Sequence, residues 1–154
     1  MRELEVRRHT MRTQPGQHLS QAGVDLARRV GESMGRFDRV VTSTLPRAFE
    51  TALAMGFAVD EQLEALSSID AGVDAEVDWE LGCAAFQRAL RLGGATARYS
   101  RRQAAVWRRI VEAGTVGCLP DSDYTAWGPA CGYCEGVRLH YDAGRWSDAQ
   151  LLRL

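Results

Sequence analysis

The stretch that decides the fold is Val6-Arg7-Arg8-His9-Thr10, a short strand-like run that ends in a histidine flanked by arginine. A second stretch, Ser43-Thr44-Leu45-Pro46-Arg47-Ala48-Phe49-Glu50-Thr51-Ala52, places another arginine in the first turn of a predicted helix. Guanidinium groups bind phosphate oxygens in bidentate fashion. Together the two stretches predict a phosphate pocket in which His9 is the nucleophile and Arg8 and Arg47 hold the anion.

Strand-like and helix-like segments alternate over the first 59 residues. In order they are a strand at 4–9, a helix at 20–34 with Ser20 as its N-cap, a strand at 37–43, a helix from Thr44 or Pro46 to Gly56, and a strand at 57–59. This order predicts a βαβ sheet with helices on both faces. Since such sheets bind ligands at the carboxyl ends of their strands, His9 and Arg47 are expected at one edge.

The remainder of the chain is less regular. Residues 67–78 are acidic and without clear periodicity, which indicates an excursion from the sheet. Helices are predicted at 79–92 and 98–112, separated by Gly93 and Gly94. A loop follows at 119–132. Two strand-like runs, 133–141 and 146–154, flank the turn signal Asp142-Ala143-Gly144 and predict a C-terminal hairpin.

Composition is that of an ordinary globular protein of 154 residues, and we expect a single domain over residues 1–154. All 19 basic residues are arginine, and the net charge of −1 favours neither nucleic acid nor a membrane as partner. No apolar run approaches the ~20 residues that span a bilayer. The first residues do not resemble a signal peptide, so a cytoplasmic location is expected.

Cys131-Gly132-Tyr133-Cys134 has the CxxC spacing of zinc and redox sites. A second CxxC and a histidine at ligand spacing are both missing from the sequence, so we interpret the pair as thiols at the start of a strand. The acidic excursion has the irregular spacing of a solvated lid. We therefore expect neither a metal nor a cofactor.

The ordered motifs resemble those of the histidine phosphatase superfamily, also called the phosphoglycerate mutase-like family. Its signature is a strand ending in Arg-His-Gly, then Leu-Thr-x-x-Gly, then Ser-x-Leu-x-Arg-Ala-x-x-Thr-Ala. The corresponding residues here are Arg8-His9-Thr10, Leu19-Ser20-Gln21-Ala22-Gly23 and the stretch 43–52. The resemblance covers roughly the first 55 residues.

The resemblance implies a three-layer α/β/α sandwich with a mostly parallel central sheet, to which the C-terminal hairpin is added. It also implies that His9 is phosphorylated and that Arg8 and Arg47 bind phosphate. Thr10 replaces the usual glycine beside the nucleophile and is assigned to the phosphate site. The family's acid is a glutamate after the third strand; here alanine stands at that position, and Glu64, one residue earlier, is the candidate general acid. Asp70 and Asp74 are other candidates, and the spacing does not choose among the three.

The largest departure concerns the second histidine of the family, which ends a late buried strand in Ser-His-Gly. This chain has only His9, His18 and His140, and none has that context. Residues 108–113 resemble the helix before that strand, and 114–120 the helix after it, so the strand is apparently absent. Because a central strand is costly to lose, we expect disturbed packing that partner copies in a homo-oligomer could relieve.

The sequence is compatible with two functions. The first is a metal-independent phosphatase that hydrolyses a phosphate monoester through a phosphohistidine on His9. The second is a catalytically weak or inactive member that binds a phosphorylated ligand or a partner protein. In the first case the expected ligands are a phosphorylated small-molecule substrate or inorganic phosphate.

Overall fold

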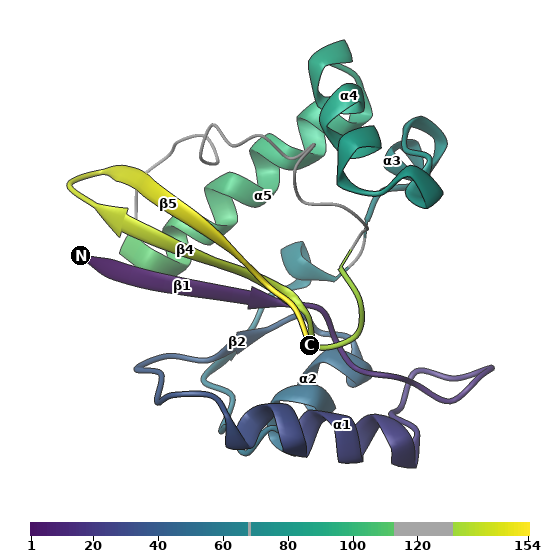
Figure 1. Ribbon diagram of the computed structural model, residues 1–154, viewed down its shortest axis with the longest axis vertical. Helices are drawn as coiled ribbons and strands as arrows, with labels where there is room; N and C mark the ends of the chain where they lie inside the picture. The colour runs from purple at the N-terminus through teal and green to yellow at the C-terminus, as the bar shows by residue number, and fades with distance from the viewer. Residues whose placement is uncertain (68, 113–130) are drawn as a thin grey trace. The chain divides into compact units, whose positions relative to one another are not determined.

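The computed structural model describes residues 1–67, 69–112 and 131–154. These residues form two compact units (Figure 1). Unit 1 consists of Met1–Val6, the described part of Ser68–Cys131, and Gly136–Arg153. Unit 2 consists of Arg7–Ser67, Gly132–Glu135 and Leu154. Each unit is therefore assembled from segments that are distant in the sequence.

Unit 1 contains a three-stranded sheet in the order β1-β4-β5, formed by Arg2–Arg7, Gly136–Asp142 and Arg145–Leu152. β4 and β5 are antiparallel and make the predicted C-terminal hairpin. Its turn residues, Ala143 and Gly144, have φ values of 46° and 85°. Positive φ at both central residues matches the right-handed twist of the strands, which is why this two-residue turn closes the hairpin.

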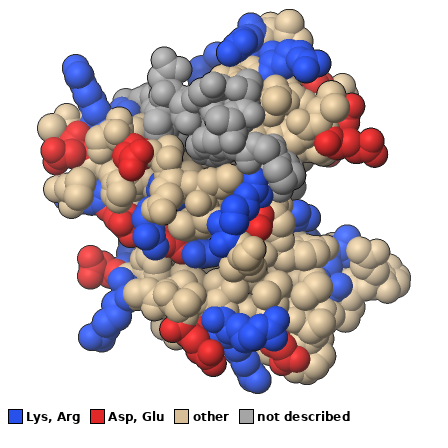
Figure 2. Space-filling model, viewed as in Figure 1, with Lys and Arg blue, Asp and Glu red and all other residues tan. Residues whose placement is uncertain are grey.

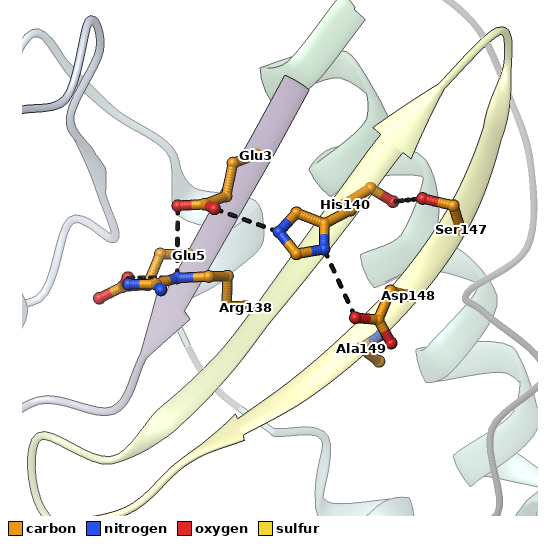
Figure 3. Close-up of polar contacts among 7 residues, drawn as sticks. All are labelled: Glu3, Glu5, Arg138, His140, Ser147, Asp148 and Ala149. Atoms are coloured by element: carbon orange, nitrogen blue, oxygen red, sulfur yellow. Dashed lines mark hydrogen bonds and ion pairs between the residues drawn. The ribbon is translucent and has the colours of Figure 1, made fainter. Parts of the chain in front are cut away.

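β1 runs antiparallel to β4, as the arrows in Figure 1 show. On one face of the two strands, Arg138 contacts Glu3 and Glu5, and His140 contacts Glu3 (Figure 3). The apolar residues of β1, Leu4 and Val6, alternate with these charged ones. Strict alternation is the pattern of a strand with one polar face, which is typical of antiparallel sheets.

The described part of unit 1 also contains four helical segments: α3 (Ala71–Glu76), η2 (Trp79–Leu81), α4 (Cys83–Leu92) and α5 (Ala95–Glu112). Their small apolar core contains Val73, Val77, Ala85 and Ala89. Both carboxylate oxygens of Glu76 accept hydrogen bonds from the first backbone N–H groups of α5. These donors have no partner within the helix, so Glu76 caps it and compensates its dipole.

Unit 2 contains α1 (Gln21–Glu32), β2 (Val41–Thr42), α2 (Pro46–Ala54), β3 (Glu61–Gln62) and η1 (Glu64–Leu66). Ser20 caps α1 as predicted, since its hydroxyl accepts from the Gly23 N–H at 3.1 Å. β2 and β3 are parallel, and β3 lies two residues beyond the predicted strand at 57–59. The core of this unit is made by Ala27, Val30, Met55 and Cys134.

The prediction of an α/β/α sandwich with a mostly parallel central sheet is wrong for the residues that the structure describes. β1 pairs with β4, while β2 pairs with β3 in a separate sheet. A central strand of a parallel sheet is buried on both faces, so its sequence is a nearly continuous run of apolar residues. β1 has charged residues at every second position, and β2 and β3 are two residues each, so none of the three meets that requirement.

The predicted loop at 119–132 falls almost entirely on residues 113–130, outside the described residues. The junction near residues 113–114 also lies outside the described residues. At this junction the sequence predicts that the family's strand with the second histidine is absent. None of the described helices combines the length and the apolarity needed to cross a membrane. In the face shown in Figure 2, basic and acidic side chains lie next to each other in several places, in keeping with the near-zero net charge.

Candidate active site

His9 lies two residues after the end of β1 and is partly buried. Its Nδ1 lies 2.6 Å from the backbone oxygen of Thr10. A carbonyl oxygen can only accept, so Nδ1 carries the proton and donates this hydrogen bond. In the neutral ring the lone pair is then on Nε2, and Nε2 is the atom of His9 that can act as a nucleophile.

The surroundings of His9 lower its pKa below the ordinary value for histidine. Burial is the largest cause, because it penalises the charged imidazolium. The hydrogen bond to the Thr10 carbonyl opposes this effect, whereas the positive charges of Arg47, Arg8 and Arg12 add to it. The imidazole is therefore held neutral, which is the form required for attack on phosphorus.

Arg47 occupies the first turn of α2, as the sequence predicts. Its Nη1 donates to Gln17 Oε1, and its Nε is buried without a hydrogen bond to any residue that the structure describes. Burial and the nearby charge of Arg12 both lower the pKa of Arg47, but an arginine remains protonated in any case. A buried, charged donor without a partner is costly unless an anion satisfies it.

Thr51 joins the His9 segment to α2. The backbone N–H of Thr10 donates to Thr51 Oγ1 at 3.1 Å, and the Thr51 hydroxyl donates to the Arg47 carbonyl at 2.6 Å. β1 and β2 are in different sheets, so the shared sheet edge that the sequence predicts is not what brings His9 and Arg47 together. The link through Thr51, within unit 2, does so instead.

Thr10 is fully buried, and its hydroxyl donates to the Gly23 carbonyl at 3.0 Å. The Thr10 hydroxyl therefore connects the segment after His9 to α1. A Cβ at Gly23 would come within 2.1 Å of the Met11 carbonyl oxygen, so only glycine permits this approach. The assignment of Thr10 to phosphate binding stays a prediction.

Glu64, the candidate general acid, begins η1 directly after β3. Its Oε2 accepts a hydrogen bond from the hydroxyl of Thr44, which follows β2, and Thr44 also contacts Ser67 Oγ at 2.8 Å. Because parallel β2 and β3 end at the same edge, Glu64 lies beside the loop that leads into α2 and Arg47. Glu64 itself is exposed.

The sequence analysis missed two side chains near His9. Arg12 is close enough for its charge to lower the pKa of His9, and it is held by hydrogen bonds to the Gly16 and Thr13 carbonyls. Tyr133 lies with its ring centroid 6.1 Å from that of His9 and 4.7 Å from Arg8 Cζ. The short separation of Arg12 from His9, three residues along the chain, is a sequence signal that could have predicted their proximity. No local sequence pattern predicts that Tyr133 lies near His9.

The other two histidines of the chain have acidic neighbours. His18 Nδ1 lies 2.5 Å from Glu50 Oε1, and the second oxygen of Glu50 accepts from the Leu19 N–H. In unit 1, His140 is flanked by Glu3 at 3.2 Å and Asp148 at 3.6 Å, on the sheet face drawn in Figure 3. His140 is thus a side chain of β4.

Cys134 is buried in the core of unit 2, and burial raises the pKa of its thiol, with contacts to Thr10 and Arg7 acting in the opposite direction. Over residues 1–67, 69–112 and 131–154, no group of three or more His, Cys, Asp or Glu side chains is arranged to hold a metal ion. The chemistry that these residues can supply is that of one neutral imidazole among guanidinium groups.

Comparison with known proteins places these motifs in a family. Searches of curated proteins and of solved structures found no match. The model of the histidine phosphatase superfamily (branch 1) matches residues 3–114. That range includes His9 and α2 with Arg47, and it ends next to the junction at which the sequence departs from the family's pattern. Since more than half of the chain is matched, this protein belongs to the histidine phosphatase superfamily.

Proposed function

We propose that the chain is a metal-independent phosphatase that hydrolyses a phosphate monoester through a phosphohistidine on His9. The observation that carries the proposal is the partly buried His9 imidazole, kept neutral by its surroundings and by the charges of Arg8, Arg12 and Arg47. The buried Arg47 Nε, unpartnered among the described residues, adds a donor for a phosphoryl oxygen. Family membership supports a phosphatase-like activity in general.

In the first step, Nε2 of His9 attacks phosphorus and the bond from phosphorus to the ester oxygen breaks. Arg8 and Arg47 neutralise the charge that spreads over the phosphoryl oxygens in the transition state. The hydrogen bond from Nδ1–H to the Thr10 carbonyl fixes the ring and stabilises the positive charge that develops on it. The product of this step is a phosphohistidine and a free alkoxide or alcohol.

Glu64 is the proposed acid for this step. Protonated Glu64 would donate its proton to the departing ester oxygen, and the resulting carboxylate would take a proton from the water that hydrolyses the phosphohistidine. The hydrogen bond from Thr44 orients the carboxyl group beside the entrance to α2. Hydrolysis releases inorganic phosphate and returns both His9 and Glu64 to their starting states.

The first test is turnover of p-nitrophenyl phosphate in the presence of a metal chelator. Wild type is expected to be active, His9→Ala to be inactive, and the matched histidine control His140→Gln to retain wild-type turnover. Quenching during turnover with alkaline detergent should trap an alkali-stable, acid-labile phosphoryl group on wild type that His9→Ala lacks. Full activity in His9→Ala, or a strict requirement for Mg²⁺ or Zn²⁺, would refute the proposed mechanism.

Glu64 is tested by comparing two leaving groups. p-Nitrophenolate leaves without protonation, whereas a simple alkoxide needs a proton, so an acid matters only for the alkyl ester. The rate of phosphohistidine formation isolates this role, since hydrolysis of the intermediate is common to both substrates. Glu64→Gln should keep the rate of phosphohistidine formation from p-nitrophenyl phosphate within a few-fold of wild type and lower the rate from an alkyl phosphate by about 10²-fold or more. Equal losses in this rate on both substrates would remove Glu64 from the role of acid.

A second candidate function is binding without turnover. It is favoured by the lack of a Ser-His-Gly motif in the sequence and by His18, whose Nδ1 contacts the Glu50 carboxylate. In that case wild type would bind phosphate or vanadate with an affinity that Arg47→Gln reduces, yet would not hydrolyse p-nitrophenyl phosphate. The same set of variants therefore separates the two functions.

A further inference from the structure

We propose that Tyr133 is the positioning residue for Arg8, so that an aromatic side chain from residues 132–135 completes the phosphate site. This inference rests on the proposed function of the site. Its basis is a turn far from His9 in sequence, which belongs to the same compact unit as His9, Arg8 and Arg47.

The turn at 132–135 is attached to the end of β1 by two hydrogen bonds. The Arg8 N–H donates to the Glu135 carbonyl at 2.8 Å, and Arg7 Nη1 donates to the Cys134 carbonyl at 2.6 Å. Both bonds come from residues directly before His9. The backbone that carries Tyr133 is thus fixed to the backbone that carries the nucleophile.

The turn is also rigid in itself. The Glu135 N–H donates to the Gly132 carbonyl, and the Glu135 carboxylate accepts from the Gly132 N–H at 2.7 Å. Cys134 has a φ of 60°, which is unusual for a residue with a side chain, and its thiol is fully buried in the core with Ala27 and Val30. The buried Cys134 side chain holds the turn in this conformation, which points the neighbouring Tyr133 toward His9 and Arg8.

The ring of Tyr133 contacts both functional groups. Arg8 Cζ lies 4.7 Å from its centroid, within the range of cation–π attraction, and the His9 ring is tilted beside it at 6.1 Å. Arg8 is exposed, and its contact with the ring reduces the number of rotamers that its long side chain samples. Less side-chain freedom is then lost on binding phosphate.

The test compares Tyr133→Phe, which keeps an aromatic face, with Tyr133→Leu, which removes it. Vanadate and inorganic phosphate are the probes, and their dissociation constants are measured with folded, full-length protein. We expect binding within about twofold of wild type for Tyr133→Phe and about threefold to tenfold weaker for Tyr133→Leu. Phe37→Leu is the matched control, since it removes a ring of unit 2 that packs on Phe57, and its affinity should equal that of wild type.

Titration of His9 by NMR in phosphate-free buffer provides a readout that does not depend on turnover. Burial and the charge of Arg8 both lower the pKa of His9, so Tyr133→Leu should raise it and Tyr133→Phe should leave it unchanged. If Tyr133→Leu alters neither phosphate affinity nor the titration of His9, the inference is overturned. If wild type binds neither probe, the proposed function fails, and the titration alone decides the role of Tyr133.

Discussion

The imidazole of His9 is partly buried and lies among three guanidinium groups, and both features lower its pKa. Arg47→Gln removes one positive charge, so protonation becomes easier and the pKa of His9 should rise. The acidic limb of the pH–activity profile should shift to higher pH with it. An NMR titration of wild type and Arg47→Gln checks the first expectation, and a pH–rate profile checks the second. An unchanged or lower pKa would contradict the proposed proximity of the two residues.

The lowered pKa of His9 also makes the stability of the folded protein depend on pH. Because His9 has a lower pKa in the folded chain than in the unfolded chain, the unfolded state binds more protons and acid favours unfolding. The stabilising contribution is complete above the unfolded pKa of about 6.5 and is lost as the pH falls through that value toward the lower folded pKa. Urea unfolding at pH 7.5 and pH 5.0 should therefore show a smaller loss of stability on acidification for His9→Gln than for wild type.

Thr51 connects the segment that carries His9 and Thr10 to Arg47, and its side chain is almost completely buried. Thr51→Val keeps the shape but leaves the buried Thr10 N–H without its acceptor. We expect a loss of roughly 1–3 kcal/mol in the free energy of unfolding. Thr51→Ser retains the hydroxyl and should lose less. Urea unfolding of wild type and the two variants measures these differences in stability. Equal stability of Thr51→Val and wild type would show that the hydrogen bond from the Thr10 N–H to Thr51 does not contribute.

At the scale of the elements, the contact between α1 and the segment after His9 depends on Gly23. Alanine is the better helix former, yet a Cβ here would meet the Met11 carbonyl oxygen at 2.1 Å. Gly23→Ala should therefore destabilise the protein by about 1–3 kcal/mol and weaken vanadate binding. Gly35→Ala is the matched control, because its Cβ would meet nothing within 4 Å. A more stable Gly23→Ala protein would contradict this packing.

The hairpin turn offers a stabilising change. Ala143 has a φ of 46°, a region that is unfavourable for alanine but readily adopted by asparagine and glycine. Ala143→Asn should raise the free energy of unfolding by about 0.5–1 kcal/mol, and Gly144→Ala should lower it by a similar amount. Thermal unfolding measures both effects. Opposite signs for the two variants are the outcome that supports the turn geometry.

At the scale of the whole molecule, the chain passes between the two units several times, so neither unit is one continuous segment. Residues 131–154 supply β4 and β5 to the sheet of unit 1 and Cys134 to the core of unit 2. Deletion of this segment should abolish cooperative urea unfolding. Deletion of Leu154 alone, which is largely exposed, is the control and should have little effect. A truncated protein with an unchanged midpoint would refute the interdependence.

Local features could be predicted because they depend on neighbouring residues. The Ser20 cap, the stop of α4 at Gly93 and the Ala143-Gly144 turn each follow from the conformational preferences of one or two residues. Strand pairing could not be predicted in the same way. The order of strands and helices and the resemblance to the family both predict a parallel sheet that contains β1, although the alternation of Glu3 and Glu5 with Leu4 and Val6 is a local sign of an antiparallel strand.

The sequence by itself determined the family, and it singled out the residues that we propose carry the chemistry: His9 with Arg8 on one side, and Arg47 at the start of a helix. Only the tertiary structure decided how they meet. Thr51 links the two segments, and Tyr133 reaches Arg8 from a turn that lies far along the chain. The physical reason is that caps and turns arise from short-range preferences, whereas these contacts depend on which distant backbone groups pair and which side chains share a core.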